Sequence, residues 1–124
     1  MLHHIVWDKG GVFVECKGKS TIQDIHEVNG LLHGDARFEQ HNFQLWDLVN
    51  TDLSQITMEE MQEPAALDLV ASAYTKEVKV AIIVTEPYAV KLIESYCEQC
   101  NEDDSPWEAQ LFSNLEDATK WVDL

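Results

Sequence analysis

Cys97 and Cys100 have the spacing of a redox dithiol or of half a zinc site. A redox dithiol lies at a helix N-terminus, where the helix dipole lowers the thiol pKa. Here the pair is expected at a helix C-terminus beside acidic residues, and both effects disfavour the thiolate. Both cysteines also fall on the apolar stripe of that helix. The sequence therefore predicts that they pack in the core as small apolar residues.

The histidines show no pair with the spacing of a helical metal site. His26 and His33 lie two turns apart on one expected helix, which is about 10 Å and too far for one metal ion. We therefore predict no metal site and no cofactor.

Asp47 is the remaining candidate for acid–base chemistry, because it lies near the C-terminal end of an expected strand, where α/β sheets bind ligands. A general base there would need a cleft and a partner such as His41. The chain contains neither a nucleophile elbow nor a phosphate-binding loop. Because aspartates often stabilise their own turns, we expect Asp47 to organise the following loop. We predict no catalytic residue and no enzyme activity.

The elements that must position these residues alternate between strands and helices. Apolar alternation and turn residues predict strands at 2–7, 12–17, 43–50, 78–85 and 107–113. Caps and 3.6-residue periodicity predict helices at about 21–34, 64–75, 87–100 and from 114 onward. The glycines at 10 and 11 predict an N-terminal hairpin. The order implies an α/β fold with a mostly parallel, five-stranded sheet in a single domain, residues 1–124.

The two faces of the predicted sheet differ in polarity. One is apolar and the other mixed, which indicates helices mainly on one face. We place four residues on the mixed face as a partner or ligand surface: Phe13, Trp46, Ile83 and Phe112. Such a patch suits a homodimer interface or a small apolar ligand. The helix at 64–75 is expected to bury Leu67, Val70, Ala71 and Tyr74, and the last helix to bury Leu115 and Ala118 with Trp121 or Val122.

Four pieces of the chain, in this order and spacing, resemble the STAS-like or SpoIIAA-like superfamily, in particular its stand-alone bacterial branch. They are Cys16-Lys-Gly-Lys-Ser-Thr-Ile-Gln-Asp24, Leu45-Trp-Asp-Leu48, Val80-Ala-Ile-Ile-Val84 and Phe112-Ser-Asn-Leu-Glu-Asp-Ala-Thr-Lys-Trp-Val122. The resemblance implies a SpoIIAA-like right-handed βα superhelix, related in architecture to the lipid-carrying Sec14 fold.

For its best-known members, the resemblance implies a non-catalytic protein-binding switch that is worked by serine phosphorylation. Their phosphorylated serine follows the aspartate–leucine pair by about nine residues, at a helix start. Here that register holds residues 55–58, and the aspartate–serine pair is missing. Ser54 and Thr57 are the possible phosphosites, although a helix cap is the commoner role for Thr57.

Composition narrows the classes of partner. Eight basic against 23 acidic residues give a net charge of −15, which argues against nucleic acid and against anionic membranes. The chain contains no long apolar run and no signal-peptide pattern, so we expect a cytoplasmic protein. We predict a non-enzymatic binding or regulatory module that acts through protein–protein contacts, as a homodimer or with an unidentified protein partner. The alternative is a carrier or sensor of a small apolar ligand.

Overall fold

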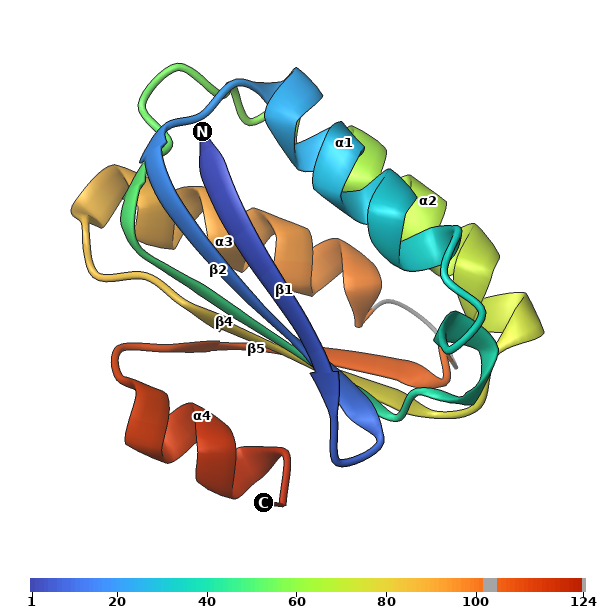
Figure 1. The fold of residues 1–124 in the computed structure, drawn as a ribbon. Helices are drawn as coiled ribbons and strands as arrows, with labels where there is room; N and C mark the ends of the chain where they lie inside the picture. Colours follow the sequence, from blue (N-terminus) through green and yellow to red (C-terminus); the bar gives the residue numbers. More distant parts are fainter. Residues whose placement is uncertain (102–104, 124) are drawn as a thin grey trace.

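The computed structural model describes residues 1–101 and 105–123, which form one five-stranded sheet (Figure 1). The strands lie in chain order across the sheet. The first pair is antiparallel and the other three pairs are parallel. The strands are β1 (Leu2–Asp8), β2 (Gly11–Lys19), β3 (Phe43–Asp52), β4 (Val78–Ile83) and β5 (Trp107–Phe112).

Helices cover the two faces of this sheet unequally. Within residues 1–101 and 105–123, three α-helices pack on one face and one short helix packs on the other (Figure 1). They are α1 (Ile22–His33), α2 (Gln62–Ala71) and α3 (Pro87–Cys100) on the first face, and α4 (Leu115–Trp121) on the second. Short 3-10 helices occur at η1 (Phe38–Gln40) and η2 (Ser72–Tyr74). The mostly parallel sheet and the unequal layers confirm the predicted fold class. No helix among the described residues is long and apolar enough to cross a membrane.

The β1–β2 hairpin forms where the paired glycines predicted it. Lys9 and Gly10 have φ angles of 55° and 83°, a region that glycine adopts at little cost. At Gly11 a Cβ atom would lie 2.4 Å from the Phe43 ring, so glycine allows β2 to approach that ring. Gly11 therefore permits the close approach of β2 to β3 at Phe43.

Side-chain caps fix the predicted helix starts. Thr21 and Asp24 form a capping box at the start of α1. The Glu86 side chain accepts from the first amides of α3, just before Pro87. Asn114 accepts from the Asp117 amide at 2.8 Å and begins α4.

Two apolar clusters hold the layers together. The larger lies between the sheet and α1–α3, and the smaller lies between β3, β4 and α4. The buried residues of the smaller cluster are Phe43, Leu45, Ala81, Ile83, Ala118 and Val122. The chain's own α4 therefore covers part of the face that was expected to be open. Leu115, which was expected to point inward on α4, is half exposed.

Candidate binding site at helix α2

The four residues predicted to share one surface do not lie together. Trp46 belongs to the larger core and is 7% exposed, and its indole N–H donates to Gln44 Oε1 at 3.0 Å. It lies level with Val14 and Ile82, whose side chains face α1–α3. Placing Trp46 on the mixed face was wrong. Both faces of β3 are apolar, so alternation within the strand did not reveal which face the helices cover.

The other three predicted residues lie against the α4 cluster. Ile83 is buried there, and Phe13 and Phe112 are partly buried. Phe112 contacts Trp121 with the ring centroids 5.5 Å apart. The predicted dimer or ligand surface is therefore largely an intramolecular contact.

Asp47 organises the end of its own strand, as its sequence context predicted. Its Oδ1 accepts from the Val49 amide at 3.2 Å. His41 lies apart from it and is buried; it bonds the Phe38 carbonyl and the Gln44 side chain. Burial lowers the pKa of His41. The structure thus does not bring Asp47 and His41 into the hydrogen-bonded pair that a general base would need.

The two possible phosphosites, Ser54 and Thr57, are exposed and lie between β3 and α2. The Ser54 amide donates to Asp52 Oδ1 at 2.9 Å. The Thr57 hydroxyl accepts from the Glu60 amide at 3.0 Å, and Glu60 Oε1 accepts from the Thr57 amide at 2.9 Å. This is the capping arrangement expected for Thr57, and phosphorylation at either residue stays a prediction.

The cysteines lie in the interior, as the apolar stripe of α3 predicted. Cys97 and Cys100 are 9% and 3% exposed. Burial raises the pKa of each thiol to about 12. The protonated forms therefore dominate at neutral pH, which suits packing and not thiolate chemistry.

Helix α2 turns its small and polar residues inward, and of the four residues expected to be buried only Ala71 packs partly against the core. It buries Pro64, Ala65 and Asp68, and Ser72 is buried just beyond its end. Leu67, Val70 and Tyr74, which were expected to be buried, are 49%, 64% and 78% exposed. Small side chains on the inner side let the helix pack closely against α3. The correction leaves an apolar stripe on the outside of the molecule.

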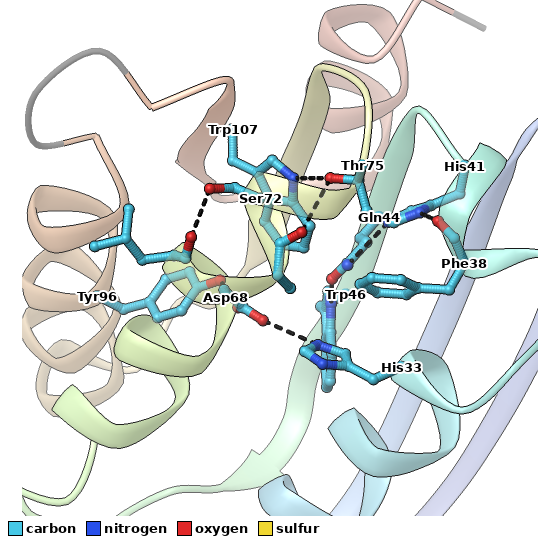
Figure 2. Close-up of polar contacts among 12 residues, drawn as sticks. His33, Phe38, His41, Gln44, Trp46, Asp68, Ser72, Thr75, Tyr96 and Trp107 are labelled. Atoms are coloured by element: carbon cyan, nitrogen blue, oxygen red, sulfur yellow. Dashed lines mark hydrogen bonds and ion pairs between the residues drawn. The ribbon is translucent and has the colours of Figure 1, made fainter.

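Hydrogen bonds to Asp68 explain this orientation. Tyr96 of α3 donates its hydroxyl to Asp68 Oδ2 at 2.5 Å, and His33 of α1 lies 3.2 Å from Oδ1 (Figure 2). Burial and the neighbouring Asp68 raise the pKa of Tyr96 well above its usual value. Asp68 thus links all three helices of this layer. A buried carboxyl group with such partners is favourable, whereas turning it outward would leave the Tyr96 hydroxyl unpaired.

A second chain of polar contacts runs beside the first. His41 bonds Gln44, which accepts from the Trp46 indole, and the Trp107 indole donates to the Thr75 hydroxyl at 2.8 Å (Figure 2). These contacts satisfy the indole N–H groups of Trp46 and Trp107. Among the described residues, no buried side-chain nitrogen or oxygen that is sealed from solvent lacks a partner.

A small cavity of about 40 Å³ lies between the sheet and α1–α3. Its lining is mostly apolar and includes Trp46 and Ile82 from the sheet, with Asn29, Asp68 and Tyr96 as the polar members. The site region therefore has two parts, which are an outward apolar stripe on α2 and a cavity beneath the same helix.

Sequence reasoning missed both parts because it oriented α2 by its apolar residues alone. Asp68 and Ser72 share the inner side with Pro64 and Ala65, so this helix carries a second stripe of small and polar residues. That second stripe was the available signal. This stripe indicates the inner side of the helix only when a buried hydroxyl group, such as that of Tyr96, lies opposite it.

The comparisons with known proteins agree with this architecture. No family model matches the chain, and no curated protein matches it. The chain is similar to the crystal structure of an uncharacterized protein from the DUF3478 family, with a SpoIIAA-like fold, from Shewanella loihica PV-4. The two share 18% sequence identity over 98% of this chain and 92% of that one, with a TM-score of 0.60. This chain therefore has the SpoIIAA-like fold that the resemblance predicted.

Proposed function

We propose that this protein is a non-enzymatic binding module that acts through protein–protein contacts, and that α2 supplies the contacting surface. The observation that carries the proposal is the outward stripe of Leu67, Val70 and Tyr74. Isolated exposed apolar residues are ordinary, but Leu67 and Val70 of α2 and Tyr74 of the adjoining η2 are three large exposed apolar side chains within eight residues, which suits association.

The occupant we propose for this surface is a second copy of the chain. A two-fold axis near Val70 would pair the two stripes antiparallel, apolar residue against apolar residue. Glu59 and Glu60, just before α2, and Glu63 in its first turn would then lie toward the partner's Lys76, beyond the far end of its helix. Each protomer carries a net charge of −15, so the copies repel at long range. We therefore expect salt to strengthen the dimer, because screening shortens this repulsion to about 8 Å at physiological ionic strength.

Sedimentation of matched variants tests the proposal. Val70→Glu places a charge in the α2 stripe, whereas Leu115→Glu places one on half-exposed Leu115 of α4 on the opposite side of the sheet. We expect the wild-type protein and Leu115→Glu to sediment as dimers at 0.5 M salt and Val70→Glu as a monomer. A monomeric wild-type protein at high concentration and high salt would refute self-association. Dissociation by Leu115→Glu alone would move the interface to the α4 side.

The cavity beneath α2 favours a second proposed function, the binding of a small, largely apolar ligand. Its mostly apolar lining with a few polar groups is typical of a ligand site, but its volume of about 40 Å³ is far below the roughly 300 to 1,000 Å³ of ordinary ligand pockets, so it suits only a few atoms of a ligand. Xenon, a purely apolar probe, tests this function. It should shift the Trp46 indole resonance in a saturable way, and the absence of such a shift would refute it.

A further inference from the structure

Asn29 is the one polar residue on the buried side of α1, where its companions are Ile22, Ile25, Val28 and Leu32. It is 6% exposed and lines the cavity. Among the hydrogen bonds of the described residues, none involves its amide group, although that group offers two donors and an acceptor. Among the described residues no side-chain nitrogen or oxygen that is sealed from solvent lacks a partner, so the Asn29 amide reaches the open side of the cavity and is free to bond a molecule that enters it.

The Asp68 carboxyl group lines the same cavity. It accepts from Tyr96 at 2.5 Å and has His33 at 3.2 Å, so two neighbouring elements fix its position. A carboxylate has about four lone-pair sites and keeps accepting capacity after these two contacts. Asn29 and Asp68 together thus offer both donors and acceptors to whatever occupies the cavity.

The remaining walls are apolar. Trp46, Leu48 and Ile82 of the sheet and Ile93 of α3 line them. The volume of about 40 Å³ is roughly three times what one water molecule needs. The enclosed part of a ligand is therefore limited to about three non-hydrogen atoms.

We propose that this cavity binds the end of a short aliphatic chain that carries a hydroxyl or a primary amine, with the polar head between Asn29 and Asp68 and the carbon atoms against Trp46 and Ile82. A hydroxyl group donates and accepts, which matches the amide and the carboxyl group together. Anions are excluded, because Asp68 and the net charge of −15 repel them. This inference rests on the second proposed function and adds to it the chemistry of the ligand head.

The test follows the four tryptophan indole resonances by NMR during titration with ethanol, ethylamine and acetate. Trp46 lines the cavity, while Trp7, Trp107 and Trp121 lie outside its lining and act as internal controls. We expect ethanol and ethylamine to shift the Trp46 signal in a saturable way. Because a ligand of three non-hydrogen atoms can bind only weakly, half-saturation of the Trp46 shift should need a ligand concentration of about 0.5 mM or above. Acetate should leave the signal unchanged.

Two variants locate the polar head. Asn29→Leu keeps the side-chain size but removes the amide, and it should weaken ethanol binding at least tenfold. Asn50→Leu, at an exposed position on β3, should bind like the wild type. The wild-type series decides the question even if Asn29→Leu does not fold.

Each outcome has a distinct meaning. A Trp46 shift with xenon but none with ethanol or ethylamine would overturn the inference and keep the apolar-ligand function. The same holds if acetate shifts Trp46 as strongly as ethanol does, or if Asn29→Leu binds ethanol normally. Equal movement of all four indoles would show non-specific solvation and also overturn it. If no probe, xenon included, shifts the Trp46 resonance, the ligand function itself is refuted.

Discussion

Removing the Tyr96 hydroxyl should destabilise the fold far more than its small size suggests. In Tyr96→Phe the ring still packs on α3, but Asp68 loses the donor at 2.5 Å and keeps only His33 at 3.2 Å. Leaving a buried polar group short of a partner costs about 1 to 3 kcal/mol. For a domain of this size, the melting temperature should fall by roughly 4 °C for each kcal/mol.

Urea unfolding monitored by circular dichroism measures this effect. Tyr74→Phe is the matched control, because the Tyr74 side chain is 78% exposed, and its free energy of unfolding should change by less than about 0.5 kcal/mol. In an Asp68→Ala background, Tyr96→Phe should cost much less than in the wild type, because its partner is already gone. Equal effects of Tyr96→Phe and Tyr74→Phe would refute the view that Asp68 orients α2.

Three further predictions concern the core and the hairpin. Burial raises the pKa of the Cys97 and Cys100 thiols to about 12, above the unfolded value of about 8.5. The stabilisation by these protonated, buried thiols is therefore complete below about pH 8.5 and is lost as the pH rises toward 12. Urea unfolding at pH 7.5 and 10 should show this loss as a lower free energy of unfolding at pH 10. In a Cys97→Ala/Cys100→Ala variant the free energy of unfolding should fall less steeply with pH, by up to about 1.4 kcal/mol per pH unit for each thiol removed. The same two thiols should react with Ellman's reagent only after unfolding, and rapid labelling of native protein would contradict their core placement. Gly11→Ala puts a methyl group 2.4 Å from the Phe43 ring and should cost about 1 to 3 kcal/mol in unfolding free energy. Gly30→Ala, with open space around it in α1, should stabilise by about 0.5 to 1 kcal/mol; the reverse order would show that the packing of Gly11 against Phe43 is described wrongly.

The strand and helix order was predictable because it depends on local signals. The hairpin glycines, the Thr21 and Asn114 caps and the alternation within β4 all act over a few residues, and the structure places them where they were expected. The unequal coverage of the two sheet faces by helices was also predictable, because apolar and polar residues share one face of β2 and β5.

The side-chain directions of β3 and α2 were not predictable in the same way. Trp46 and Leu45 lie on opposite faces of a strand that is apolar on both, so its facing depends on pairing with β2 and β4. In α2, two hydrogen bonds to Asp68 decide the inner side against a larger apolar stripe. Both outcomes depend on residues distant in sequence. The candidate site, which lies on and under α2, was missed for that reason.

The accessibility of cysteines introduced on either side of α2 measures which side of this helix faces the core. Val70→Cys and Ser72→Cys are compared at low micromolar protein and low salt, where the proposed dimer is dissociated. Val70 is 64% exposed and Ser72 is 6% exposed. We expect the cysteine at position 70 to react with Ellman's reagent as fast as a free thiol, and the one at position 72 to react only through local opening of the helix. Fast reaction at 72 with protection at 70 would contradict this orientation of α2.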